Sequence, residues 1–83
     1  MSNKKRQILN VGFENTVLLD RVVAVVSSET KPIKRLVSES RNLRKVVDAT
    51  EGRKTRAVIV TDSDHLILSS LKPQTITERI KAR

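Results

Sequence analysis

Three closely spaced cationic side chains carry the clearest chemical signal in the sequence: Arg53, Lys54 and Arg56, within Gly52-Arg53-Lys54-Thr55-Arg56. Gly52 supplies the positive φ that turns often need, so we expect a tight turn between two apolar strands. Such a turn projects its side chains outward, where an arginine fork can bind phosphate or guanine through two parallel hydrogen bonds. The pattern predicts a nucleic-acid-binding loop. A solvated loop that only keeps the protein in solution is the alternative.

A second group of basic residues lies on one edge of a predicted helix. The helix should begin near Thr30 or Lys31, because threonine caps free N–H groups and Pro32 is tolerated only in the first turn. The apolar and small residues that form its buried stripe are Ile33, Leu36, Val37, Ser40 and Leu43. The basic residues that stack beside this stripe, within roughly 40° of one another, are Lys34, Arg41 and Lys45. Because two elements contribute positive charge, we include this edge in the predicted nucleic-acid-binding surface.

The segment Asp62-Ser63-Asp64-His65 has the residue types of a metal or catalytic site, with two carboxylates beside the only histidine. Adjacent residues leaving a hairpin point to opposite faces, so convergence on one ion or on a Ser–His–Asp triad is awkward. Asp and Ser also form the local hydrogen bonds that a turn needs. The sequence contains no second histidine, nucleophile elbow or phosphate-cradling glycine motif. We therefore expect a turn, no metal or other cofactor, and no enzymatic activity.

Arg21 stands where an apolar strand begins, next to Asp20. An ion pair between these two neighbours is one explanation for a charge at a strand end. A contact to a ligand or to another subunit is the other, and the sequence leaves both open.

The charge distribution indicates a polyanionic partner. The chain of 83 residues has 17 basic and 9 acidic side chains, a net charge of +8. Residues 31–56 hold nine of the bases against three acids, whereas 7–30 and 57–80 are mildly acidic. Solubility alone gives little reason for this segregation, and a nucleic acid explains it.

Aromatic content favours a duplex over a single strand. Proteins that bind single strands commonly stack bases on exposed aromatic side chains. Phe13 is the only aromatic residue, and we expect it in the core. Charge without stacking residues favours double-stranded DNA, bound largely through its phosphates.

Composition also narrows the class of protein. The chain has no cysteine, which excludes disulfides, thiolate metal sites and a cysteine nucleophile and favours the cytoplasm. No apolar run approaches the ~20 residues of a membrane span, and no apolar segment follows the basic N-terminus as in a signal peptide. We expect a cytoplasmic protein without membrane contact or small-molecule substrate.

The predicted fold class is α+β: a small, mainly antiparallel sheet with one central helix and a short C-terminal helix. Strands are expected at 8–11, 21–26 (covered on both faces), 46–49, 56–61 and 65–70, the last two paired antiparallel. Residues 17–19 are apolar without a clear state, and Pro73 permits the terminal helix. We expect a basic tail at 1–7, one DNA-binding domain at 8–73, and a short helix with a basic tail at 74–83.

Two long strings of residues resemble a known family. Residues 48–59 read D-A-T-x-G-R-x-T-R-A-V-I, and residues 62–69 read D-S-D-H-x-I-L-S. With Asn10-Val11-Gly12-Phe13 and Lys31-Pro32-Ile33-Lys34-Arg35, they resemble the RemA family of small bacterial regulators of extracellular-matrix (biofilm) genes. The resemblance runs from about Ile8 to Pro73.

The resemblance implies a DNA-binding transcription factor that assembles into ring-like homo-oligomers and engages DNA over an extended surface. The family's paired basic residues, which are linked to DNA binding, fall on Arg53 and Lys54. Its functionally sensitive Arg and Pro fall on Arg21 and Pro32, which we assign to a DNA or subunit contact. The alternative is a basic interaction protein or RNA-binding module whose partner is an acidic protein or an RNA.

The chain departs from the family at two places. Lys54 stands where the family usually has arginine, so charge is kept without the bidentate fork. Residues 42–45 replace a segment that tends to contain glycine in the family, so we expect the central helix to end later.

Overall fold

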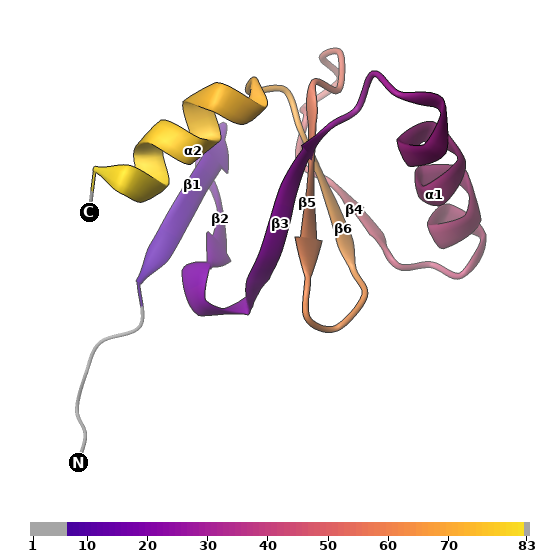
Figure 1. The fold of residues 1–83 in the computed structure, drawn as a ribbon, viewed down its shortest axis with the longest axis horizontal. Coiled ribbons are helices and arrows are strands. Elements are labelled where there is room, and N and C mark those ends of the chain that lie inside the picture. Colours follow the sequence, from indigo (N-terminus) through magenta and orange to yellow (C-terminus); the bar gives the residue numbers. More distant parts are fainter. Residues whose placement is uncertain (1–6, 83) are drawn as a thin grey trace.

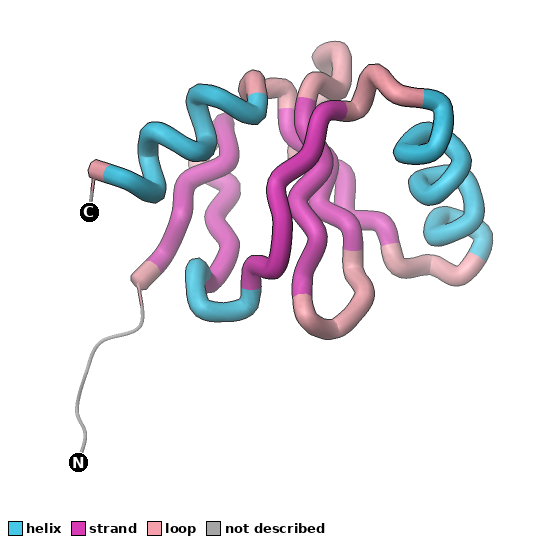
Figure 2. The backbone as a smooth tube through the Cα atoms, in the orientation of Figure 1, coloured by secondary structure: helices cyan, strands magenta, loops and turns pink. Residues whose placement is uncertain are grey.

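Two small sheets and two α-helices make up the computed structural model, which describes residues 7–82 (Figures 1 and 2). In chain order the elements are β1 (Ile8–Gly12), β2 (Asn15–Leu18), the 3₁₀ turn η1 (Leu19–Arg21), β3 (Val22–Ser27), α1 (Lys31–Asn42), β4 (Val46–Asp48), β5 (Ala57–Thr61), β6 (Leu66–Ser69) and α2 (Pro73–Lys81). β1 and β2 form an antiparallel hairpin. The other strands form a sheet in the order β3-β5-β6-β4, antiparallel except for the β4–β6 pair. The predicted α+β class is confirmed.

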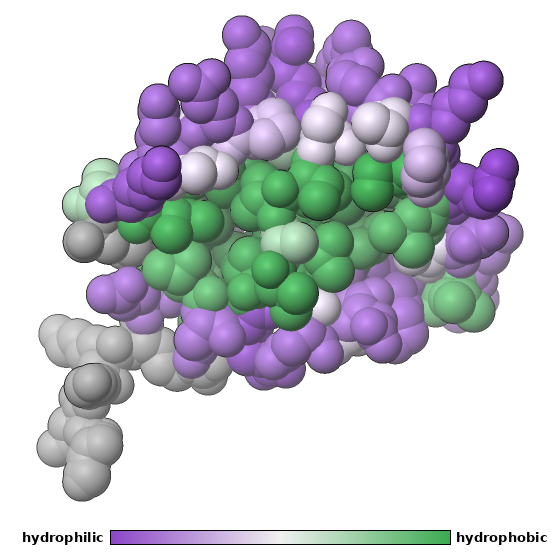
Figure 3. Space-filling view, in the orientation of Figure 1, coloured by the Kyte–Doolittle hydropathy of each residue, from purple (hydrophilic) through white to green (hydrophobic). Residues whose placement is uncertain are grey.

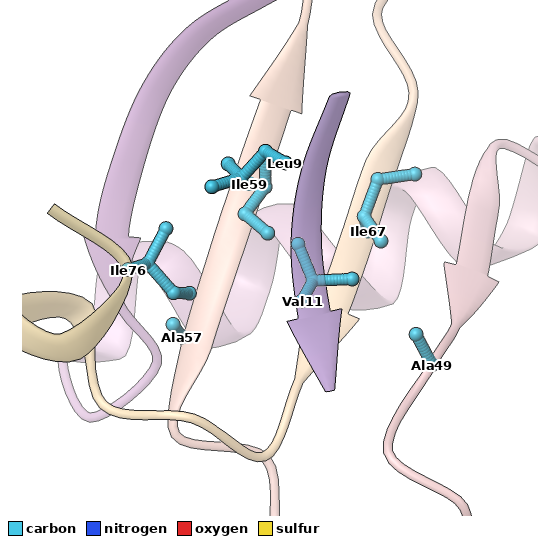
Figure 4. Packing of buried hydrophobic residues seen from close by; sticks show 7 residues of the cluster. All are labelled: Leu9, Val11, Ala49, Ala57, Ile59, Ile67 and Ile76. Carbon is cyan, nitrogen blue, oxygen red and sulfur yellow. The ribbon is translucent and has the colours of Figure 1, made fainter. Parts of the chain in front are cut away.

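The side chains of the central strands β5 and β6 alternate between the two faces of the sheet, and both faces are covered. The residues that pack on one face, toward β1, β2 and α2, are Leu9, Val11, Ala49, Ala57, Ile59, Ile67 and Ile76 (Figure 4). On the other face, Val58, Leu66 and Leu68 pack against Ile33 and Val37 of α1. The sheet therefore lies between α1 on one side and the β1–β2 hairpin with α2 on the other.

The predicted start of α1 is confirmed, and its predicted extension is wrong. The Thr30 hydroxyl accepts a hydrogen bond of 3.4 Å from the Ile33 N–H, and Pro32 occupies the first turn. The helix ends at Asn42, and Arg44 adopts a φ of 60°. The N–H groups of Lys45 and Arg44 then bond the carbonyls of Ser40 and Arg41, at 2.9 and 3.0 Å. This is a Schellman C-cap with an arginine at the position that usually takes glycine, so Lys45 lies outside the helix.

The expectation that β3 is covered on both faces is also wrong. β3 lies at an edge of its sheet, and the Val23 side chain is 66% exposed. Figure 3 shows the molecule from the side on which β3 lies nearest the viewer, and this face carries a continuous apolar band bordered by polar side chains. The reason is topological: residues 17–19, whose state the sequence left open, belong to β2 and η1, and β2 pairs with β1 in a separate sheet, so β3 has a neighbouring strand on one side only.

The short C-terminal helix is confirmed as α2. Ile76 has no exposed surface and anchors α2 against β1 and β3, and Ile80 packs against the same cluster. No helix within residues 7–82 is long and apolar enough to cross a membrane. Most of the predicted basic N-terminal tail lies outside the described residues.

Candidate nucleic-acid interface

The loop between β4 and β5 is fixed at its base by Asp48 and Thr50. One Asp48 carboxylate oxygen accepts hydrogen bonds from the Thr50 N–H at 2.9 Å and from the Thr50 hydroxyl at 2.6 Å. The Thr50 carbonyl accepts the Arg53 N–H at 3.0 Å, closing a turn in which Glu51 and Gly52 have φ values of 53° and 81°. The predicted glycine turn is therefore present, and its hydrogen bonds define the backbone that carries the basic residues.

These hydrogen bonds also set the charge state of Asp48. The Thr50 hydroxyl contributes most to a pKa below the ordinary value of 3.8, followed by the Thr50 N–H and the nearby Arg41 guanidinium; partial burial opposes them. Hydrogen bonds to the charged form favour that form. The carboxylate therefore holds the loop as an anion at neutral pH.

A groove of about 670 Å³ lies between this loop, the β1–β2 turn and α2. We call it the Arg53 groove; its lining residues are Asn10, Gly12, Phe13, Arg53, Lys54, Arg56, Ser70, Leu71 and Arg79. The three predicted loop cations are thus brought together, and Arg79 joins them from α2. The Arg56 N–H bonds the Ser69 carbonyl at 2.8 Å, which fixes the end of the loop to β6.

Sequence reasoning missed Arg79. Its guanidinium donates to the carbonyl and to the side-chain oxygen of Asn10, at 3.2 and 3.1 Å. The available signal was helical spacing: Arg79 follows the buried Ile76 by three residues, which places both near one face of α2.

The expected core position of Phe13 is wrong. Phe13 and Glu14 form the β1–β2 turn, and the Phe13 side chain is 48% exposed. The Arg53 guanidinium carbon lies 5.4 Å from the centre of the phenyl ring, within the range of a cation–π contact. The residue is therefore part of the groove wall.

A second groove, of about 230 Å³, lies on the other side of the loop. We call it the helix groove; its lining residues are Ser28, Glu29, Lys34, Val37, Arg41, Lys54, Thr55 and Leu68. Lys54 lines both grooves and approaches Glu29 at 3.9 Å, with both side chains largely exposed. The structure therefore brings Lys34 and Arg41 to the loop. Lys45 precedes β4 whereas the loop follows it, so Lys45 lies toward the opposite end of the sheet (Figure 1).

Comparison with known proteins identifies the family of this chain. The family model described as RemA-like, "Extracellular matrix regulatory protein A-like", matches residues 8–80. The chain belongs to the RemA-like family.

Similar RemA-like proteins bear regulatory names. Relatives from Symbiobacterium thermophilum and Heliobacterium modesticaldum are each 51% identical over 77 residues, which is 93% of this chain and 81% and 85% of theirs. A Brevibacillus brevis relative is 48% identical over 77 residues, 93% of this chain and 90% of its own. All three are named "Putative regulatory protein". These names indicate regulation rather than catalysis.

Arg21 of this RemA-like protein lies apart from the loop cations, and Pro32, in the first turn of α1, lines neither groove. The Arg21 side chain binds both carboxylate oxygens of Asp62, at 2.7 and 2.9 Å. An ion pair with the neighbouring Asp20 was one of the two alternatives that the sequence left open. Its carbonyl also accepts the Asp62 N–H at 2.9 Å, which ties η1 to the β5–β6 turn. That turn and the 50–56 loop lie at opposite ends of the sheet (Figure 1).

The segment from Asp62 to His65 forms the predicted turn of the RemA-like fold. The Asp64 N–H bonds the Thr61 carbonyl at 3.2 Å, and Asp64 has a φ of 65°. The Ser63 hydroxyl lies 2.8 Å from Nδ1 of His65. Within the described residues, no group of three or more His, Cys, Asp and Glu side chains is arranged to hold a metal ion.

Proposed function

We propose that this RemA-like protein is a non-enzymatic, cytoplasmic transcriptional regulator that binds double-stranded DNA around the 50–56 loop. The observation that carries the proposal is the convergence of Arg53, Lys54, Arg56 and Arg79 on one groove. Lys34 and Arg41 extend the positive surface across the loop into the helix groove. A polyanion placed over the loop meets cations on both sides.

The loop geometry suits phosphate binding. Hydrogen bonds from Thr50 and Arg56 fix the backbone at both ends of the basic segment. A fixed backbone reduces the conformational entropy that is lost on binding. Each phosphate neutralised by a lysine or arginine releases counterions, which makes binding favourable and strongly salt-dependent.

We further propose that ring-like homo-oligomers repeat this surface along the DNA, to control extracellular-matrix genes. The apolar band on the face shown in Figure 3 supports subunit association, because exposed apolar patches commonly mark interfaces. The exposed Val23 of the edge strand β3 adds apolar surface to the protein. Several weakly binding loops on one DNA molecule gain avidity. Arg21 and Pro32 then act as subunit contacts or second-site DNA contacts, away from the Arg53 groove.

RNA is the second candidate partner, and the exposed Phe13 favours it. An exposed aromatic side chain beside an arginine can stack an unpaired base. Duplex DNA remains the better fit because Phe13 is the only aromatic residue of the chain, whereas single-strand surfaces stack successive bases.

A pair of charge deletions tests the proposal. Arg53→Ala removes a groove cation, and Arg35→Ala removes an exposed cation of α1 that lines neither groove. Fluorescence anisotropy with a labelled duplex should show about tenfold weaker binding for Arg53→Ala, a loss of ~1.4 kcal/mol. For this variant, the plot of the logarithm of the binding constant against the logarithm of the salt concentration should have a slope that is shallower by about 0.9 for each engaged subunit. Equal losses for the two variants would contradict a role for the loop.

A further inference from the structure

The turn that carries Phe13 has an unfavourable backbone. Phe13 and Glu14 have φ values of 54° and 66°, and Gly12 precedes them at 113°. Two-residue turns with both φ values positive strongly prefer Asn-Gly or Gly-Gly, because a Cβ is strained there. A bulky residue in this conformation persists only where surrounding contacts hold it. Here the Asn10 and Asn15 side chains bond the N–H and the carbonyl of Gly12, at 2.8 and 3.0 Å.

Core packing does not explain the phenylalanine. Its side chain is nearly half exposed, while Leu9 and Val11 of the same hairpin are fully buried. The contact that distinguishes it is the one with the Arg53 guanidinium. The strained turn therefore places the chain's only aromatic ring against a groove cation.

This contact leaves the hydrogen-bonding groups of Arg53 free. The ion pairs observed within residues 7–82 join Arg21 to Asp62 and Lys54 to Glu29, and Arg53 has neither an ion pair nor a side-chain hydrogen bond there. A carboxylate partner would occupy the N–H donors of the guanidinium, whereas the face of a ring attracts its charge without accepting those bonds. A flexible arginine is thereby restrained while its donors stay available.

We propose that Phe13 is a positioning residue for nucleic-acid binding: its ring holds the Arg53 guanidinium in place at the groove wall. This inference rests on the proposed DNA-binding function. Restraining a rotamer-rich side chain before binding reduces the entropy lost on binding. The benefit comes from the ring's π face, so an aliphatic side chain of similar bulk does not replace it.

Three substitutions of Phe13 separate the π contact from bulk and from turn geometry. Phe13→Leu keeps an apolar side chain and should weaken duplex binding about two- to fivefold, the range of an exposed cation–π contact. Phe13→Trp keeps a π face and should bind as the wild type does. Phe13→Asn suits positive φ and should bind as weakly as the leucine variant, with unchanged or raised thermal stability. Loss of binding without loss of stability distinguishes positioning from a structural role.

A double-mutant cycle with Arg53→Ala, measured at low salt, completes the test. If Phe13 acts through Arg53, Phe13→Leu has no effect once Arg53 is alanine. An undiminished effect in that background means that the ring itself touches the nucleic acid, and overturns the positioning role. If Phe13→Leu binds like the wild type while Arg53→Ala is weak, the inference fails and the proposed function stands. If Arg53→Ala itself binds like the wild type, the role of the loop fails and the inference fails with it.

Discussion

The Ser69 hydroxyl donates a hydrogen bond of 2.7 Å to the carbonyl of Val11, in the interior, between two sheets. Ser69 is fully buried at the end of β6, and its own carbonyl accepts the Arg56 N–H at 2.8 Å. Val11 lies two residues before Phe13. One serine therefore connects the β1–β2 hairpin, which carries Phe13, with the end of the loop that carries Arg53.

Ser69→Ala should lower the free energy of unfolding by about 1–3 kcal/mol, because the buried Val11 carbonyl loses its donor. The Leu71 N–H, which bonds the same hydroxyl at 3.1 Å, also loses a partner. Chemical denaturation measures the change. Ser38→Ala, on the exposed side of α1, is the control and should change stability by no more than about 0.5 kcal/mol. Equal effects of the two substitutions would refute the structural role of this bond.

Arg44→Gly should stabilise the protein. Arg44 occupies the left-handed position of the Schellman cap, where glycine has no Cβ strain. We expect a gain of about 0.5–1 kcal/mol, seen in thermal melting as a midpoint raised by several degrees. Leu43→Gly is the matched control, because Leu43 is also exposed but has a φ of −91°. That variant should be destabilised, and a similar loss for Arg44→Gly would contradict the strain argument.

Acid should weaken the base of the loop through Asp48. Its pKa in the folded protein is lowered, chiefly by the Thr50 hydroxyl. A carboxyl group whose pKa is lowered by folding stabilises the folded protein at pH values above its ordinary pKa of 3.8. This contribution disappears as the pH falls through the pKa of the group in the folded protein. Asp48→Asn lacks the titrating group, so the stability difference between wild type and variant should shrink from pH 6 toward pH 3. A difference that is constant across this range would exclude the effect.

Glu29→Gln should tighten duplex binding. Glu29 lies in the helix groove and approaches Lys54 at 3.9 Å, so its charge opposes a polyanion at that point. Removing the charge should make the binding constant more dependent on salt: its log–log slope against salt concentration should become steeper by up to about 0.9 per engaged subunit. Glu39→Gln makes the same charge change at an exposed site on α1 outside both grooves. Equal tightening by both variants would show that only net charge matters.

Local signals account for the parts of the fold that the sequence predicted. The Thr30 cap and Pro32 define the start of α1, and the turn at Asp62 defines the β5–β6 hairpin. Gly52 likewise marks the turn that carries the basic loop. Each depends on residues that are neighbours along the chain.

Features that depend on tertiary arrangement could not be predicted in the same way. The position of Phe13 depends on a hairpin that forms a sheet separate from β3, and Arg79 reaches the groove only because α2 packs beside β1. The wrong prediction for Lys45 has a local cause: Arg44 adopts the left-handed conformation that a sequence normally marks with glycine.

The most direct test of the DNA-binding proposal is fluorescence anisotropy of wild-type protein on a labelled duplex across a salt series, with single-stranded RNA as competitor. If the groove cations neutralise several phosphates, the logarithm of the binding constant should fall with the logarithm of the salt concentration with a slope of about −0.9 for each phosphate. We also expect little displacement by RNA. A shallow slope, or ready displacement by RNA of equal length, would contradict duplex DNA as the partner of this surface.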